Sequence, residues 1–426
     1  MAMGQRSGHF LLGLCALLLL SASGPAMISG RVVDHITGKP LQDAMVTVGR
    51  EVVRTDEKGQ FLVRATGNVI GARACGYQRG QLPITSPTPA VPLQIRLVPF
   101  SPKALYLTFY GIGSRAIRRP ALKLIEETEL NAVVIDVKGD RGMIPFKSSV
   151  PLAQETGAQK IRTVRDMPEL LADLKKRGIY TIARIVVFKD NPLALLRPRL
   201  AVKTSGGSIW RDREGLAWVD PFSKEVWDYN IDIAIEAAQL GFDEIQFDYM
   251  RFPDTPGLVF SMANTQENRI SAIKGFLTEA RNRLVPYNVF LAADIFGYVC
   301  WNLNDTYIGQ RLEDVVPIVD YISPMLYPSG FQFGIPGYRN PVAHPGEIVY
   351  LSLQRAAQRS GVSPVRFRPW LQAFRDYAFD KRHFTGVELR NQIDAAERSG
   401  SIGWMIWNPV NQYSGEGLLK KQRSHA

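Results

Sequence analysis

Cysteine and histidine are scarce in this chain, which limits the kinds of site it can build. The 426 residues include three cysteines and five histidines. Cys15 lies in an apolar N-terminal run, and Cys75 and Cys300 fall in different predicted domains, so no disulfide framework is expected. The scattered histidines and the lack of a CxxC motif give no zinc-ligand spacing. We therefore expect a functional site without a metal ion or an organic cofactor.

Long apolar runs are also rare, and the clearest occupies residues 10–20. Arg6 precedes it and small residues follow at 21–26. A run this short does not span a bilayer, and this order is typical of an export signal. The sequence therefore predicts a signal peptide over residues 1–26, a secreted or periplasmic protein, and no stable membrane span after cleavage. An uncleaved N-terminal membrane anchor is the alternative.

Acidic residues are outnumbered by basic ones, 40 against 51, which gives a formal net charge of +11. A positive surface attracts polyanions such as an acidic polysaccharide. A basic surface that is merely solvated is the alternative. We expect a polysaccharide or oligosaccharide partner and no nucleic acid partner.

Residues 27–100 carry short alternating strands separated by turn residues. The turn sequences TGKP and DEKG and the short spacing between strands favour antiparallel connections, so this region predicts a small antiparallel β-sandwich. The motifs GxVxD, TGKPL, AxVxV, TDxxGxF and GY, in this order, make the region similar to carboxypeptidase regulatory-like domains. That resemblance implies an accessory module without catalytic residues. Residues 84–92 are predicted to form its last long loop.

From residue 101 to 415 the pattern changes to strands separated by helix-sized intervals. The expected strands are 104–110, 132–138, 180–188, 243–249, 289–296, 320–327, 366–374 and 402–408. Eight strands over this length predict an α/β fold, a (β/α)8 TIM barrel, followed by a tail at 416–426. An open doubly wound sheet is the alternative, but no glycine-rich phosphate loop follows the first strand.

The segment GFDEIQFDYMRFP, beginning at Gly241, carries the strongest functional signal. Ile245, Phe247 and Tyr249 alternate with Glu244, Gln246 and Asp248, which predicts one apolar and one polar strand face. A carboxylate at the end of a barrel strand is costly to bury without a partner and lies where barrel active sites are built. The alternative is a structural Asp248 paired with Arg251 or capping the next turn.

Carboxylates, amides and aromatic rings recur at the ends of the predicted strands. Sugars need polar groups beside flat rings, and a glycosidase needs two carboxyl groups that flank the scissile bond. Adjacent strands bring Asp248 and Asp294 together, so we predict them as the catalytic pair. Apolar neighbours favour Asp294 as the acid/base, and Arg251 should keep Asp248 ionised as nucleophile or charge stabiliser. The predicted substrate-binding residues are Asp136, Arg251, Trp218, Trp301, Tyr327, Trp370, Gln372, Trp407 and Asn408.

Several segments give the barrel region a family resemblance. AVVIDVKGDRG, GFDEIQFDYMRFP, ADIFG, DYISPMLYPSGF, NPVAHPGE and GWMIWNP resemble the glycoside hydrolase-like barrels of domain of unknown function 4015. That family is distantly similar to the α-amylase superfamily, which implies a nucleophile at Asp248 and an acid/base at Asp294. Gln246 stands where the amylase pattern has Arg, and Asp294 where it has Glu. In the family-18 chitinase pattern the proton donor would fall on Met250, which disfavours that mechanism.

These observations predict a secreted glycoside hydrolase that cleaves O-glycosidic bonds of an envelope or extracellular polysaccharide with two carboxylates. The alternative is a noncatalytic carbohydrate-binding barrel protein of the cell envelope. Asp136 and Asp140 are second choices for the catalytic groups.

Overall fold

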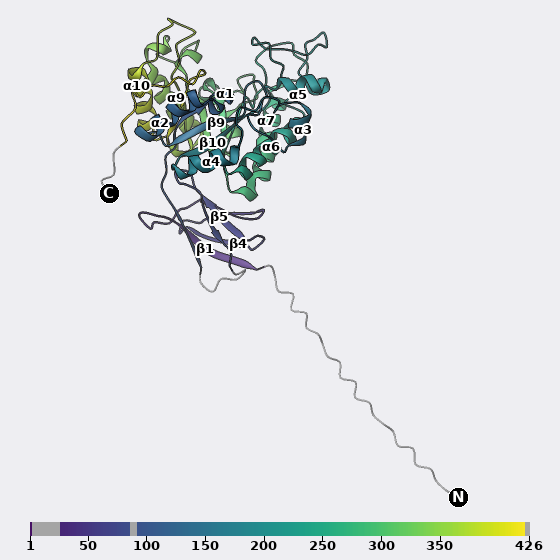
Figure 1. Ribbon diagram of the computed structural model, residues 1–426, viewed down its shortest axis with the longest axis vertical. Helices are drawn as coiled ribbons and strands as arrows, with labels where there is room; N and C mark the ends of the chain where they lie inside the picture. Colours follow the sequence, from purple (N-terminus) through teal and green to yellow (C-terminus); the bar gives the residue numbers. More distant parts are fainter. Residues whose placement is uncertain (2–25, 86–91, 422–426) are drawn as a thin grey trace.

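The computed structural model describes Met1, residues 26–85 and residues 92–421, which form a small β domain and a large barrel (Figure 1). The predicted signal peptide lies outside the described residues, apart from Met1 and Ala26. Most of the predicted loop at 84–92 also lies outside them. No helix within the described ranges is long and apolar enough to cross a membrane.

The small domain consists of two sheets that face a common apolar core. One sheet has the order β4-β1-β7, with β1 at Met27–Asp34, β4 at Gln60–Arg64 and β7 at Leu93–Leu97. The other has the order β3-β2-β5-β6, with β2 at Met45–Val48, β3 at Glu51–Arg54, β5 at Val69–Arg73 and β6 at Gly80–Pro83. Val32, Val46, Ile70 and Ile95 lie in the core between them. The expected sandwich was antiparallel throughout, but β1 and β7 pair in parallel, with Val32 opposite Ile95.

Eight parallel strands close into the predicted barrel, with β15 pairing back to β8. The strands are β8 Lys103–Leu107, β9 Ala132–Lys138, β10 Tyr180–Val186, β11 Glu244–Asp248, β12 Phe290–Phe296, β13 Tyr321–Met325, β14 Trp370–Gln372 and β15 Trp404–Trp407. Each overlaps a segment that the sequence predicts as a strand. The (β/α)8 fold class is therefore confirmed.

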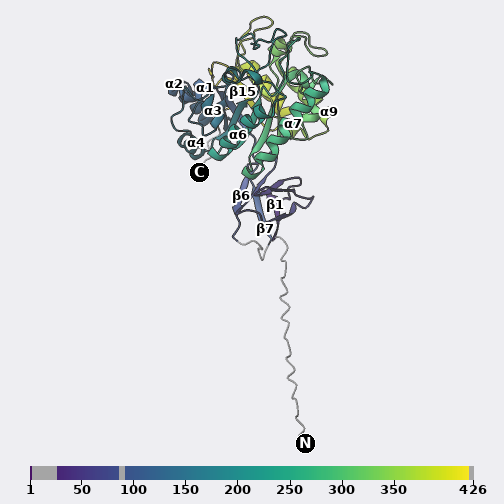
Figure 2. The same cartoon turned by 90° about the vertical axis from the view of Figure 1, so that its right-hand side faces the viewer.

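Long helices cover the outside of the barrel (Figures 1 and 2). They are α2 Arg115–Glu127, α4 Met167–Lys176, α6 Lys224–Leu240, α7 Gln266–Leu284, α9 Pro345–Ser360 and α10 Gly386–Arg398. Four shorter helices are α1 Phe109–Gly113, α3 Pro151–Glu155, α5 Asn191–Leu196 and α8 Leu312–Val315. Gly241 and Gly361 end α6 and α9 with φ angles of 104° and 67°, a left-handed conformation that glycine adopts without a Cβ penalty.

Strand β11 shows why this sequence forms a barrel wall. Ile245 and Phe247 belong to the core between the strands and the helices, whereas Glu244, Gln246 and Asp248 contact residues of the barrel interior. Glu244, the first residue of the strand, pairs with Arg368 inside the barrel. Tyr249 departs from the expected alternation, because the strand ends at Asp248 and Tyr249 has a φ of 49°.

The small domain packs against the amino-terminal ends of the barrel strands. Arg73 contacts Asp320 at 3.3 Å, Arg79 contacts Asp243 at 3.5 Å, and the Gly76 amide donates to the Tyr321 hydroxyl at 3.1 Å. Asp243 and Asp320 directly precede β11 and β13. Both ribbon views show the domain at this one end (Figures 1 and 2). The carboxyl ends of the strands therefore lie away from it.

Candidate active site

Arg184 organises the carboxyl end of the barrel. Its side chain projects from β10, between β9 and β11, and is fully buried. One guanidinium nitrogen, Nη1, donates to Asp136 Oδ1 at 2.7 Å. The other, Nη2, donates to Asp140 Oδ1 at 2.8 Å and to Asp248 Oδ2 at 2.6 Å. A single cation thus faces three carboxyl groups.

Both oxygens of Asp248 accept hydrogen bonds. Arg184 Nε and Nη2 donate to Oδ2, and the Tyr249 amide donates to Oδ1 at 2.6 Å. The left-handed conformation of Tyr249 turns that amide back onto the carboxylate. Arg251 was expected to hold Asp248 ionised, but its guanidinium lies over the rings of Trp218 and Tyr249 and donates to the Phe252 carbonyl. The cation beside Asp248 is therefore Arg184, which is distant in the sequence and adjacent in the sheet.

Asp294 lies beside Asp248 at the same level of the barrel, because Phe247 pairs with Ala293 across β11 and β12. Its Oδ1 accepts from Gln246 Nε2 at 2.7 Å and from Trp370 Nε1 at 2.8 Å, while its buried Oδ2 has no hydrogen-bond partner. Complete burial, together with the nearby charge of Asp248, raises the pKa of Asp294 well above its ordinary value. Its burial and the neighbouring carboxylate therefore both favour the protonated form of Asp294.

Asp136 closes the other side of the cluster. Its Oδ2 accepts from the Tyr106 hydroxyl at 2.7 Å and from the Phe109 amide at 3.2 Å. Burial raises the pKa of Asp136, although the charge of Arg184 opposes this effect. Asp136 is 2% exposed, whereas the side chain of Asp140 is 36% exposed. Asp140 is thus the carboxylate of this cluster that most clearly faces solvent.

Aromatic rings border the carboxylates on the β8 and β15 side. Trp407 stacks on Tyr106 with ring centroids 4.0 Å apart, and the Arg184 guanidinium lies 4.9 Å from the Trp407 ring. Tyr327 lies 6.5 Å from Trp407. Trp407 and Tyr327 are partly exposed, so these two predicted binding residues are placed where a sugar could reach them.

Other predicted binding residues are committed to contacts within the protein. Trp218 is 2% exposed and donates to Asp212, and Trp370 is 1% exposed and donates to Asp294. The Gln372 side chain bonds Ser329 and the Phe374 carbonyl, which joins two loops. Asn408 closes its own turn through Ala373, Val410 and Gln412. These four side chains are buried and hydrogen-bonded within the protein, so their direct contact with substrate stays a prediction.

Trp301 is partly exposed but lies against α9, where its Nε1 donates to Ser352 and Arg355 covers its ring at 5.2 Å. It is therefore not part of the carboxylate cluster.

Tyr106 and Tyr249 contact this cluster but were not among the predicted site residues. Tyr106 occupies the inward face of β8 two residues after Ala104, so strict alternation could have identified it. The turn of Tyr249 has no comparable sequence signal.

Within the described ranges no three His, Cys, Asp or Glu side chains are grouped so that they could hold a metal ion.

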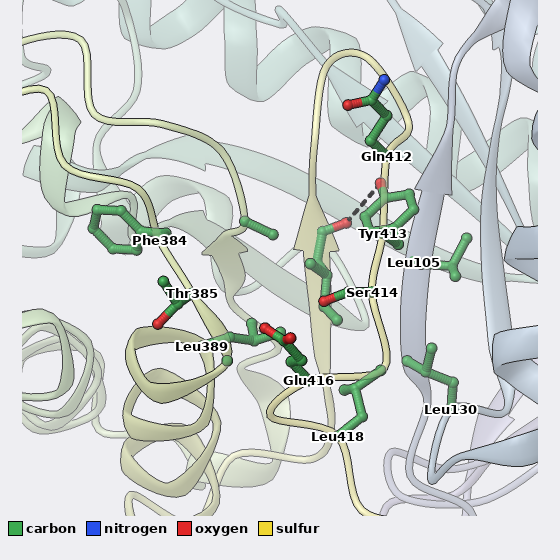
Figure 3. A pocket seen from close by; sticks show the side chains of 13 residues that line it. Leu105, Leu130, Phe384, Thr385, Leu389, Gln412, Tyr413, Ser414, Glu416 and Leu418 are labelled. Atoms are coloured by element: carbon green, nitrogen blue, oxygen red, sulfur yellow. Dashed lines mark hydrogen bonds between the residues drawn. The ribbon is translucent and has the colours of Figure 1, made fainter.

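A cavity of about 390 Å³ lies outside the barrel wall, beside α10 (Figure 3). Outward side chains of β8 and β15, Leu105 and Ile406, line it together with Leu389 and Tyr413. After β15 the described chain runs to residue 421 without a further helix, and the segment 412–418 covers this side instead. The cavity is thus a packing gap of the outer layer, away from Arg184 and its carboxylates.

Comparison with known proteins gives one family match and several structural likenesses. Residues 104–413 match the model of the family DUF4015, described as "Putative glycosyl hydrolase domain". No curated protein matches the chain.

Two solved structures illustrate the likenesses. A hypothetical protein from Ruminiclostridium thermocellum is 39% identical, with 45% of this chain and 96% of that chain covered and a TM-score of 0.40. The PgaB (BpsB) glycoside hydrolase domain from Bordetella bronchiseptica is 15% identical, with 74% and 95% covered and a TM-score of 0.54. The second likeness supports the barrel fold.

Proposed function

Because the chain belongs to the DUF4015 family of glycosyl hydrolase-like domains, we propose that it is a glycoside hydrolase acting on an envelope or extracellular polysaccharide. The observation that carries the proposal is the cluster of Asp136, Asp140 and Asp248 around one buried arginine, next to the partly exposed ring of Trp407. The proposal includes export of the protein, which the apolar run at residues 10–20 supports.

The charges of this cluster suit the chemistry of glycoside hydrolysis. The transition state is a sugar cation, which anionic groups fixed in place stabilise without reorganising. Three carboxyl groups surround one guanidinium, so the cluster carries surplus negative charge when they are ionised. Asp248 is the group we assign to stabilise or attack that cation, because Arg184 and the Tyr249 amide fix both of its oxygens.

The proton donor must deliver its proton to the leaving oxygen. We assign this role to Asp294, since its raised pKa keeps it protonated beside Asp248. Asp294 is fully buried, however, so the assignment requires that substrate binding opens a path to its Oδ2. Asp140 already has the exposure, and comparison of the two variants decides between them.

The test is a screen of the purified mature chain against envelope polysaccharides, with detection of new reducing ends. Wild-type protein should release them, and Asp248→Asn should lower turnover by about 10³-fold or more while binding is retained. Asp394→Asn, a substitution of an exposed carboxylate on α10, is the matched control and should behave as wild type.

Asp294→Asn and Asp140→Asn complete the set. The variant of the true donor should lose the alkaline limb of the rate profile, because a general acid works only while it is protonated, and it should affect substrates with poor leaving groups most. If folded Asp248→Asn protein turns over at the wild-type rate, the assignment is wrong. If wild-type protein binds a polysaccharide and releases no ends, the noncatalytic carbohydrate-binding function replaces the enzymatic one.

A further inference from the structure

The aromatic rings near the carboxylates continue beyond Tyr327 to two rings in the loop after β14. Phe374 lies 5.5 Å from Tyr327, and Tyr377 lies 6.2 Å from Phe374 with the two rings only 7° from parallel. Together with the Tyr106–Trp407 stack, these rings form a continuous series that begins beside Arg184. We call Trp407, Tyr327, Phe374 and Tyr377 the aromatic track.

The outer end of the track is its most exposed part. Tyr106 beneath it is 1% exposed, the next three rings are partly exposed, and Tyr377 at the outer end is 52% exposed. A series that served only core packing would become more buried away from the mouth. The order observed here instead leads from the carboxylate cluster to solvent across the loops that follow β13 and β14.

The loop that carries Tyr377 is held rigidly by the residue before it. The buried carboxylate of Asp376 accepts from Ser329 Oγ at 2.7 Å and from the amides of Ala378, Phe379 and Lys381 at 3.0, 2.8 and 2.9 Å. Burial raises the pKa of Asp376, but these hydrogen bonds outweigh it and lower the pKa to about 2. Ser329 is itself fixed by Gln372 Nε2 at 2.7 Å. Tyr377 is therefore presented to solvent by a loop that is already ordered, which reduces the entropy lost on binding.

We propose that the aromatic track binds successive sugars of a polysaccharide chain. The substrate is then a polymer that extends from the carboxylate cluster over the loops after β13 and β14, rather than a short glycoside. The apolar C–H faces of sugar rings lie on Trp407 and Tyr327 near the scissile bond and on Phe374 and Tyr377 at the rim. Asp376 is a positioning residue that acts through Tyr377. This inference rests on the proposed glycoside hydrolase function.

The test uses β-glucan, chitosan, xylan and alginate as probes, each as the polymer and as its dimer. Polymer affinity is measured by gel electrophoresis with the polymer in the gel, and dimer affinity by isothermal titration calorimetry, both in an Asp248→Asn background so that no probe is consumed. Tyr377→Ala and Phe374→Ala should weaken binding of the bound polymer by about 5- to 150-fold, the range expected for loss of one stacking ring, and should leave the dimer unchanged.

Two control variants make the result specific. Tyr377→Phe keeps the ring and should bind the polymer as the parent does. Tyr350→Ala removes a partly buried ring of α9 that lies beneath Arg398 of α10, and it should have no effect on either probe. Asp376→Asn removes charge from the loop and should weaken polymer binding in the same direction as Tyr377→Ala, with the dimer again unaffected.

Unchanged polymer affinity in folded Tyr377→Ala and Phe374→Ala, or no binding of any polymer, overturns the track. If the track variants lose polymer binding but wild-type protein cleaves no probe, the track stands and the enzymatic proposal fails. The two proposals are therefore tested separately.

Discussion

At the scale of single residues, Asp294 is the group whose protonation state has the largest consequence for the site and for stability. Gln246 and Trp370 both donate to Oδ1, so this oxygen acts as an acceptor and Oδ2 is left for the proton. An ionised Asp294 would place an uncompensated charge in a buried site beside Asp248, whose own charge is paired with Arg184, and this is costly. Folding therefore favours the protonated form.

This preference predicts how stability depends on pH. Because the folded-state pKa of Asp294 is raised, the folded protein binds more protons than the unfolded chain above about pH 4, and this residue makes the free energy of unfolding fall as pH rises. Asp294→Asn keeps both acceptor contacts and does not titrate. Its melting temperature should therefore gain on wild type over the range in which pH rises from about 4 toward the raised pKa of Asp294. A constant difference across that range would show that Asp294 does not titrate as described.

Part of this chemistry could be predicted from the sequence. The ends of two adjacent predicted strands located Asp248 and Asp294. The partner of Asp248 was wrong, because proximity in the sequence pointed to Arg251 whereas the register of β10 and β11 brings Arg184. The register between two strands is set by the closed barrel, so it could not be predicted from the sequence of either strand alone.

At the scale of elements, strands were easier to predict than the loops that follow them. Each barrel strand needs an apolar outer face, and this requirement shows directly in the sequence. The 189–222 segment, by contrast, contains α5 and a 3₁₀ helix at Pro198–Leu200, and it buries Trp218 against Trp210 and Tyr249. Whether a loop tryptophan packs inward or faces a ligand depends on contacts that only the fold supplies.

Trp218 and Trp407 should therefore respond differently to the same substitution. Trp218→Ala removes a buried ring and should lower the free energy of unfolding by about 3–5 kcal/mol, with polysaccharide affinity kept in the fraction that folds. Trp407→Ala should weaken polysaccharide binding and lower stability less, because its ring is partly exposed. Urea unfolding and affinity electrophoresis of both variants check this. Equal loss of affinity in both would place Trp218 in the binding surface after all.

At the scale of the whole molecule, the small domain and the carboxylate cluster occupy opposite ends of the barrel. Arg73 and Arg79 reach residues that precede strands, whereas Arg184, Asp248 and Asp294 lie toward the strand ends. The sequence predicted both domains but not this placement, because the contacts join positions more than 160 residues apart. The similarity of the small domain to carboxypeptidase regulatory-like domains and the α-amylase relationship stay predictions.

This arrangement predicts that the domain interface supports stability without contributing to chemistry. The Arg73–Asp320 pair is almost completely buried, and the pKa of Asp320 is lowered by Arg73, Arg281 and the Leu291 amide, which outweigh the effect of its burial. Asp320 thus stabilises the fold above about pH 4, and this contribution is lost as pH falls through the lowered pKa. Arg73→Ala removes one partner of Asp320 but leaves Arg281 and the Leu291 amide, so it should lower the free energy of unfolding by about 1–3 kcal/mol at neutral pH. Arg79→Ala breaks the partly exposed pair with Asp243 and should lower the free energy of unfolding by at most about 1 kcal/mol.

Urea unfolding measures the free energy of unfolding of both variants, and the turnover per folded molecule of each variant should equal that of wild type. A fall in turnover at unchanged stability would mean instead that the small domain influences the opposite end of the barrel.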